Sequence, residues 1–343
     1  MPLTLHPLNL ASAPAWDAFV DAMPSGTFFH RSAWRTLIAQ EFGHLTFYTY
    51  AERDGSIVGV LPLVWVKTLL FGNTLTSTPF CVYGGPLAAD AEAAEALSAY
   101  AASLLPETGA SAVEFRHRDA VESDWAERPG LYVTFRKPIT AKHDDNMKAI
   151  PRKQRAMVRK GIQNGLTSTV EHDATRLHRI YAESVRNLGT PVFSRRWFAA
   201  LMHAFRDDAD IVTIMHGSTP VASVMNFYFR DEVLPYYGGG TTAARQVAGN
   251  DFMYWEVMRR AAERGYRLFD FGRSKLGTGA YSFKHNWGFE PAPLPYRYKL
   301  APGAHIPDHN PLNPKYALFI AAWKRLPLAL ANRIGPPIVR GLG

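Results

Sequence analysis

The feature that most constrains the fold is an internal repeat. Each half of the chain reads as strand, Gly-Ser turn, strand, then a Tyr-Gly-Gly stretch, a helix-like segment and a short strand after a glycine. The matched stretches are 47–60 with 211–224, 83–86 with 237–240, 91–105 with 251–264, and 112–115 with 268–271. Because the matches keep the same order, they predict a duplicated fold.

Apolar periodicity adds two helices at the start of each half. These predicted helices cover 15–23, 33–42, 174–188 and 194–207. Each half then continues as a three-strand meander, helix, strand, helix and strand. We therefore expect an α/β (α+β) chain in which mixed, mostly antiparallel sheets are flanked by helices. This order resembles the fold of the Gcn5-related N-acetyltransferases (GNAT), here in tandem.

The size and charge of the chain agree with a globular, two-domain protein. At 343 residues it exceeds the size of a usual single core. Its one cysteine, Cys81, excludes an internal disulfide and is interpreted as a buried, inert thiol. Neither Met1–Leu10 nor any apolar run resembles a leader or a membrane span, so a cytoplasmic location is expected. The net charge of +8 favours polyanionic partners.

A basic segment connects the two halves. Six cations and no acid lie between Lys148 and Lys160. Pro151 suits the first turn of a helix, on which Arg152, Arg155 and Arg159 would share one face. The segment is either a solvated linker surface or a grip for phosphate, and the absence of acids favours the phosphate interpretation.

The candidate reaction site follows the strand that ends at Asp270. A glycine-rich loop with Arg273 and Lys275 leads to Tyr281 and Lys284, which are one helical turn apart if the segment is helical. Asp270 either forms a structural ion pair or accepts a proton from an attacking amine. Lys284, in aromatic surroundings, either stabilises an oxyanion or extends to water.

Other motifs do not fit this chain. Asp270-Phe271-Gly272 spells the kinase metal tripeptide, but no catalytic loop precedes it. The stretch 272–278 has the spacing of a phosphate-binding P-loop, with Thr278 in place of the lysine. No metal site is expected. Arg273, Lys275 and Tyr237, which belongs to the repeated Tyr-Gly-Gly stretch, are further candidates for substrate binding.

Three stretches resemble the FemAB-related proteins of the exosortase (PEP-CTERM) system. The first is the segment that contains 269–274, 277–281, 283–284 and 286–291. The second is the basic segment 158–161, and the third is 322–327 of the tail. The resemblance covers almost the whole chain. It implies two tandem acyltransferase domains and membership of the wider Fem peptidyltransferase clan.

Members of that clan attach amino acids from aminoacyl-tRNA to a peptidoglycan precursor without a metal. The resemblance implies that Lys284 matches a lysine that stabilises the acyl-transfer transition state. It also implies that Arg155 and Arg159 correspond to cations that hold precursor phosphates. For the exosortase-associated branch it implies an envelope setting, with the substrate left open.

One departure bears on the acyl donor. Acetyl-CoA enzymes of this fold cradle pyrophosphate on an Arg/Gln-x-x-Gly-x-Gly/Ala loop at a helix N-terminus. The corresponding stretch, 245–251, lacks both glycines or ends in Asp251, depending on the alignment. Because a carboxylate would face the phosphates, coenzyme A is disfavoured, and Asp251 is interpreted as a residue of the helix start.

The tail, Lys315 to Ile334, combines apolar residues with Lys324, Arg325 and Arg333, and Pro327 interrupts it. It either packs on the second domain or docks on an anionic inner membrane leaflet.

These observations predict an N-terminal GNAT-like domain (1–145), a basic connecting helix (146–165), a C-terminal GNAT-like domain (166–303), and a Pro-rich segment with an amphipathic tail (304–343). The expected function is N-acyl transfer of the FemAB type to the amine of a phosphate-bearing envelope precursor. Aminoacyl-tRNA and acyl-CoA remain the possible donors, with no bound cofactor. An acyl-CoA-dependent N-acetyltransferase and a non-catalytic scaffold for envelope assembly are the alternatives.

Overall fold

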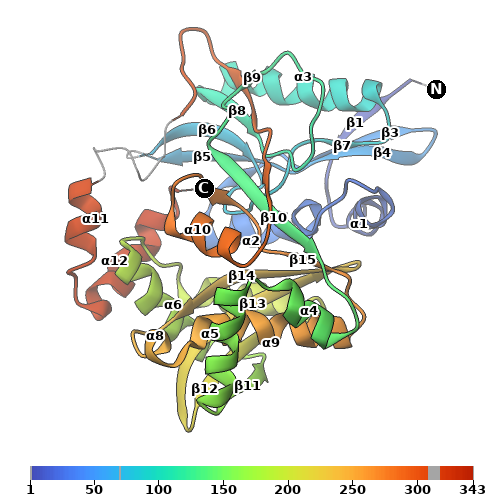
Figure 1. Cartoon of the computed structure of the whole chain (residues 1–343). Coiled ribbons are helices and arrows are strands. Elements are labelled where there is room, and N and C mark those ends of the chain that lie inside the picture. Colours follow the sequence, from blue (N-terminus) through green and yellow to red (C-terminus); the bar gives the residue numbers. More distant parts are fainter. Residues whose placement is uncertain (1, 69–70, 308–316, 343) are drawn as a thin grey trace. The chain divides into compact units, whose positions relative to one another are not determined.

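The computed structural model describes residues 2–68, 71–307 and 317–342. The chain forms two compact units that do not follow the sequence halves strictly (Figure 1). Unit 1 contains 1–131, 293–310 and 340–343, and unit 2 contains 132–292 and 311–339. Most of the predicted Pro-rich segment, and Lys315 of the tail, lie outside the described residues.

Unit 1 holds two sheets, with strand orders β1-β3-β4-β7 and β2-β5-β6-β8-β18-β9. Pro62 separates β4 from β5, because proline cannot donate to a central ladder. The elements are β1 (Thr4–Pro7), α1 (Ala13–Ala22), a 3-10 turn (Phe28–His30), α2 (Ala33–Phe42), β2 (Leu45–Thr46), β3 (Thr49–Arg53), β4 (Ser56–Leu61), β5 (Leu63–Thr68), β6 (Gly72–Ser77), β7 (Leu87–Ala88), α3 (Ala91–Thr108), β8 (Ala112–Phe115), β9 (Ala126–Glu127) and β18 (Arg297–Leu300). Cys81 is buried in this unit, as predicted.

Unit 2 holds one larger sheet, in the order β11-β12-β13-β14-β15-β10-β16, with β17 paired to β10. Its elements are β10 (Tyr132–Pro138), α4 (His143–Ala149), α5 (Arg152–Gln163), β11 (Leu166–Glu171), α6 (Thr175–Leu188), α7 (Arg195–Ala204), β12 (Ala209–His216), β13 (Thr219–Phe229), β14 (Glu232–Gly240), α8 (Ala244–Val247), α9 (Gly249–Glu263), β15 (Leu268–Asp270), β16 (Ser274–Lys275), α10 (Gly279–Asn286), β17 (Pro291–Pro293), α11 (Ala317–Trp323) and α12 (Leu328–Val339). The six predicted helices of the two halves are confirmed as α1, α2, α3, α6, α7 and α9.

The glycines at the end of β14 locate the helices on the two faces of this sheet. The Cα of Gly239 lies against Ser184 of α6, whereas Gly238 lies against Tyr254 of α9. Successive residues of a strand face opposite sides of a sheet. Helices α6 and α9 therefore cover opposite faces of β14, which produces the layered α/β arrangement predicted from the sequence.

The same strand pairings recur in both units. In unit 1, β6 pairs in parallel with β8, and in unit 2, β14 pairs in parallel with β15. The helix between the two strands is α3 in one case and α9 in the other. The repeat also differs in detail, since Tyr237–Gly240 ends β14, whereas Tyr83–Gly85 lies in a loop after β6.

Each half supplies one strand to the other unit. β10 belongs to the first half of the sequence, yet it pairs antiparallel with β15 and β16 of unit 2. β18 belongs to the second half, yet it pairs antiparallel with β8 and β9 of unit 1. The compact units therefore differ from the predicted domain ranges at these two exchanged strands, and unit 2 also contains the basic helix α5 and the helices α11 and α12.

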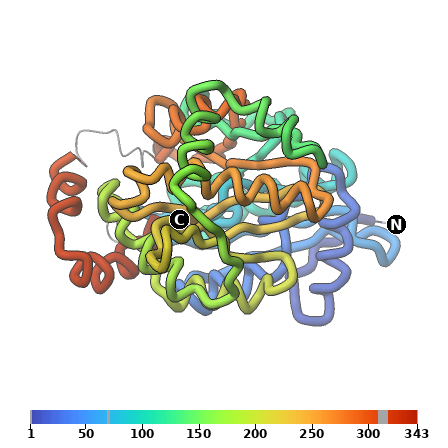
Figure 2. The backbone as a smooth tube through the Cα atoms, turned by 60° about the horizontal axis from the view of Figure 1, so that its bottom comes forward, coloured from blue at the N-terminus to red at the C-terminus, as the bar shows by residue number. Residues whose placement is uncertain are grey.

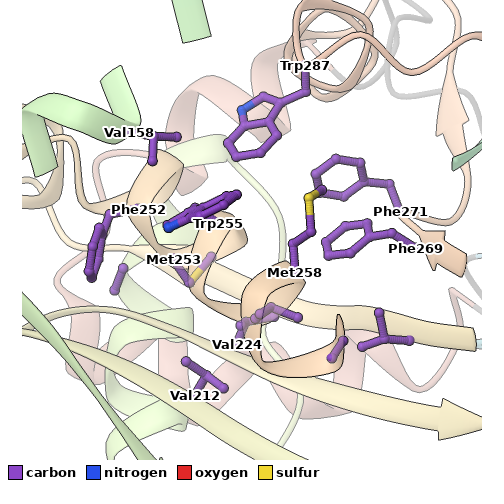
Figure 3. Packing of buried hydrophobic residues seen from close by; sticks show 14 of the residues in the cluster. Val158, Val212, Val224, Phe252, Met253, Trp255, Met258, Phe269, Phe271 and Trp287 are labelled. Atoms are coloured by element: carbon purple, nitrogen blue, oxygen red, sulfur yellow. The ribbon is translucent and has the colours of Figure 1, made fainter. Parts of the chain in front are cut away.

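The core of unit 2 is aromatic where α9, β15 and the segment after α10 meet. Phe269, Phe271, Trp287 and Phe289 are buried and make edge or tilted ring contacts with one another. Figure 3 shows Trp287 and Phe271 beside Met258 of α9. Such rings bury large apolar areas, so they fix the position of β15's end and of α10.

The C-terminal helices belong to unit 2. Helix α12 packs on α6, and the two C-terminal helices are drawn in red beside it (Figure 2). This is the first of the two alternatives predicted for the tail. Within residues 2–68, 71–307 and 317–342, no helix has the length and apolar character needed to cross a bilayer.

Candidate active site

The chain leaves the sheet where β15 ends. The Phe271 N–H donates to the Phe135 carbonyl at 2.9 Å, and Gly272 then adopts a left-handed conformation with φ of +64°. Pairing with β10 resumes at Ser274 and Lys275. Because residues with a Cβ rarely adopt a positive φ, glycine at position 272 permits this short excursion from the sheet.

Asp270 holds this excursion in place. Its buried carboxylate accepts the Gly272 N–H at 2.6 Å through Oδ1 and pairs with Nε of Arg136 at 3.2 Å through Oδ2. Arg136 lies opposite Asp270 on β10 and also bonds Glu232. A buried carboxylate needs such partners, and here they make it a structural element of the loop.

Lys284 reaches the same loop from α10. Thr278 caps this helix by accepting the Tyr281 N–H, which sets the turn that carries both Tyr281 and Lys284, as predicted. The Lys284 ammonium donates to the carbonyls of Gly272 and Arg273, each at 3.0 Å. An ammonium has three donors, so two of them fix its position at the end of β15.

The surroundings of Lys284 lower its pKa to about 7. Burial is the main cause, because it penalises the charged ammonium. Asp270 opposes this and raises the pKa, while Arg273 lowers it further. The Phe135 ring lies 5.8 Å from the ammonium and supplies part of the apolar environment. Lys284 therefore changes charge near neutral pH.

Tyr281, Arg273 and Lys275 surround this centre. The Tyr281 ring meets Phe135 edge to face, with centroids 5.4 Å apart. The Arg273 guanidinium lies 4.6 Å, and the Lys275 ammonium 5.4 Å, from the centroid of the Tyr132 ring on β10. Two cations on one ring concentrate positive charge at this edge of the sheet, where an anionic group can be bound.

Tyr237 lies in a different aromatic cluster. Its ring is buried against Tyr181, Phe193 and Phe198, and its hydroxyl accepts the Trp197 N–H at 3.3 Å. It does not belong to the cluster around β15 and α10. Its predicted part in substrate binding stays a prediction.

Arg155 and Arg159 lie on α5, the basic helix predicted after Pro151. Its opposite face, with Gln154, Val158 and Gly161, is buried against α9. Arg159 is exposed, whereas Arg155 is half-buried and donates to the Lys148 carbonyl at 3.4 Å. The cations thus form an outer face, and their binding role stays a prediction.

The start of α9, the stretch that corresponds in sequence to a pyrophosphate-binding loop, carries Asp251. Asp251 is buried there and accepts hydrogen bonds from Trp287 at 3.0 Å and Gln154 at 3.1 Å. Burial raises the pKa of Asp251, and these two bonds oppose that rise. The residue thus lies in the first turn of α9, at a helix start as predicted, where a negative charge is favourable.

Two residues of this site were not identified from the sequence. Phe135 and Arg136 come from β10, which lies more than 130 residues before Asp270 in the sequence. Their strand pattern is readable, because apolar and polar residues alternate along 133–136. The partner strand is not readable, since register with a distant strand is set by tertiary packing.

Comparisons with known proteins place this site in a known type of domain. Residues 147–285 match the model of the acetyltransferase (GNAT) domain. A crystal structure of FemX superposes with a TM-score of 0.68 at 15% identity, covering 93% of this chain and all of that one. No curated protein matches the chain in sequence.

Two further structures share the fold. One is the C-terminal domain of a lysylphosphatidylglycerol synthetase from Agrobacterium fabrum, with a TM-score of 0.55 at 12% identity, covering 86% of this chain and 94% of that one. The other is a tandem GNAT protein from the clavulanic acid pathway, with a TM-score of 0.52 at 13% identity, covering 87% and 98%. The protein is an acyltransferase whose C-terminal half carries a GNAT acetyltransferase domain.

Proposed function

We propose that the protein is an N-acyltransferase of the FemAB type, which moves an aminoacyl group from aminoacyl-tRNA to the amine of a phosphate-bearing envelope precursor. The exosortase-associated setting belongs to this proposal. The observation that carries it is the Lys284 ammonium, held at the end of β15 by the Gly272 and Arg273 carbonyls. A fixed cation at a strand end is suited to stabilise charge that develops during acyl transfer.

The proposed step forms one bond and breaks one. The acceptor amine nitrogen attacks the ester carbonyl carbon of the donor, and the carbonyl oxygen becomes an oxyanion. Lys284 stabilises this oxyanion with its ammonium. The intermediate collapses when the carbon–oxygen bond to the ribose breaks. The proton released by the nitrogen goes to the departing oxygen, so that an amide and a free hydroxyl result.

The other candidate residues have supporting roles in this proposal. Asp270 positions the loop that Lys284 contacts, since both of its oxygens bind neighbouring groups. Tyr281 orients the acceptor from the turn that carries Lys284. Arg273 and Lys275 bind an anionic part of a substrate beside Tyr132. Arg155 and Arg159 bind phosphate of the precursor or the tRNA.

The proposed donor rests on the start of α9. A pyrophosphate cradle needs open backbone N–H groups at a helix N-terminus. Here Asp251, bonded by Gln154 and Trp287, brings a carboxylate to that position, and a carboxylate repels phosphate. This geometry supports a donor that does not depend on such a cradle. The likeness in fold to FemX agrees with the proposal.

An acyl-CoA-dependent N-acetyltransferase is the second candidate. It is favoured by the match of residues 147–285 to the acetyltransferase (GNAT) domain. In that case Lys284 would stabilise the same oxyanion, and the departing group would be the thiolate of coenzyme A.

The test compares Lys284→Ala with wild type. The full chain is incubated with labelled aminoacyl-tRNA or acetyl-CoA and with amine-bearing, phosphate-bearing precursors. Loss of a fixed group that stabilises an oxyanion is expected to reduce turnover by about 10²–10³-fold. Lys137→Ala is the matched control, because Lys137 is another half-buried lysine bonded to a carbonyl, that of Ala149.

Transfer from acetyl-CoA alone would replace the first candidate by the second. Transfer that is unchanged in Lys284→Ala would contradict the proposed role of Lys284 with either donor. A folded protein that transfers from neither donor would favour the scaffold alternative, in which the protein binds the precursor and catalyses no reaction.

A further inference from the structure

The helices α11 and α12 are anchored to unit 2 along one face. A Cβ at Gly189 would lie 2.5 Å from Ile320, and Nη1 of Arg186 donates to the Lys324 carbonyl at 3.2 Å. Leu328 packs against the buried cluster of Ala182, Val185 and Val192. The inner face of the two helices is therefore held by α6 and the segment after it.

The opposite face leaves large apolar side chains in solvent. Leu318 is 86% exposed on α11, while Leu330 is 43% and Ile334 is 36% exposed on α12. In α12 the buried residues are Ala331, Gly335 and Val339, so Leu330 and Ile334 lie on the other side of the helix. Large apolar side chains that remain exposed on neighbouring elements mark a surface that binds something.

Cations accompany these apolar residues. Arg325 and Arg333 are exposed on the same two helices, whereas the Lys324 side chain lies against Gly189 on the inner face. Arg333 lies one turn from Leu330 on α12, and Arg325 one turn from the exposed Ala322 on α11. From 309 to 343 the sequence contains no acid. The face therefore combines apolar side chains with a single sign of charge.

We propose that the outer face of α11 and α12 binds the surface of an anionic phospholipid bilayer. Apolar side chains on such a face enter the boundary between headgroups and acyl chains, and the cations bind the anionic headgroups. Because the inner face is already held by α6, the helices do not have to fold upon binding, which removes an entropic cost. Figures 1 and 2 show both helices in red outside α6.

This proposal is independent of the proposed acyl transfer, and its test uses neither donor nor acceptor. The full chain is sedimented with vesicles of phosphatidylcholine, with or without phosphatidylglycerol, over a range of salt concentrations. We expect binding to the phosphatidylglycerol vesicles that weakens as salt increases. Leu318→Ser should weaken the partitioning about tenfold, and Arg325→Gln about fivefold.

Two matched variants serve as controls. Leu10→Ser removes an apolar side chain of similar exposure, 88%, from unit 1. Lys153→Gln removes an exposed cation from α5 of unit 2. Neither variant should change the partitioning, and thermal melts check that all four variants are folded. A larger loss in Lys153→Gln than in Arg325→Gln would move the lipid contact to α5 and overturn the proposal.

Two other outcomes also overturn it. Equal binding to vesicles with and without phosphatidylglycerol would remove the role of the cations. A concentration-dependent dimer that Leu318→Ser dissociates, without vesicle binding by the wild type, would show that a second copy of the chain covers this face.

Discussion

At the scale of single residues, Lys284 is a group whose charge depends strongly on its neighbours. Its ordinary pKa is far above neutral, and burial lowers the pKa to about 7. Asp270 opposes that change, while its second oxygen is bound to Arg136. The charge on Lys284 therefore depends on the Asp270 carboxylate of β15. That carboxylate is in turn paired with Arg136 of β10, a strand from the first half of the sequence.

Asp270→Asn should therefore move the pH dependence of acyl transfer. Asn keeps an oxygen for the Gly272 N–H but removes the charge that raises the pKa of Lys284. An oxyanion-stabilising Lys284 must be protonated, so activity is expected to fall as pH rises through about 7 in the wild type. In the variant, this fall should begin about one pH unit lower.

The same shift can be measured without turnover. The rate at which an amine-specific reagent labels Lys284 follows its neutral fraction, and peptide mass spectrometry reports that rate at each pH. Asp251→Asn, which removes another buried carboxylate of unit 2, should leave the profile unchanged. A labelling profile that is identical in wild type and Asp270→Asn would show that Asp270 does not act on Lys284.

At the scale of elements, the end of β14 is shaped by close packing. A Cβ at Gly239 would lie 2.5 Å from Cβ of Ser184 on α6, which is closer than side chains approach. Gly240 is similarly close to Asn250 and Ala244 near the start of α9. The glycines of the repeated stretch therefore serve to bring helices onto both faces of β14.

Gly239→Ala is thus expected to lower the free energy of unfolding by about 1–3 kcal/mol, because Ser184 and α6 must shift. Gly279→Ala is the matched control. It lies in α10 with no atom within 4 Å of the added methyl group, so it should raise stability by about 0.5 kcal/mol. Chemical denaturation measures both. Equal effects in the two variants would contradict the packing account.

The sequence predicted the elements better than their partners. Helix faces and glycine turns are local patterns, so α5, α9 and the turn with Tyr281 and Lys284 could be predicted. The burial of Tyr237 among Tyr181, Phe193 and Phe198 could not be predicted, because it depends on packing between distant elements. The contact of Phe135 with Lys284 is missed for the same reason.

At the scale of the whole molecule, the two exchanged strands make the halves depend on each other. A chain cut between Ala141 and Lys142 yields a first fragment without β18 and a second without β10. The second fragment would then leave β15 and β16 without the strand that joins them. An exposed strand edge of this kind promotes aggregation.

We therefore expect each fragment to be insoluble when produced alone and soluble when both are produced together. Soluble yield and a cooperative thermal transition report the result. Thr134→Pro in the first fragment is the control, because proline is not tolerated inside a central strand such as β10 and should prevent rescue. A second fragment that melts cooperatively by itself would contradict this expectation.

The exchanged strands also set an order of events during synthesis. About 180 residues separate Phe115 of β8 from its partner Arg297 of β18, which at 5–20 residues per second is roughly 10–40 s of translation. During that time the edge of β8 that receives β18 stays open on the nascent chain. The first unit therefore completes its sheet only when the last part of the second half has left the ribosome.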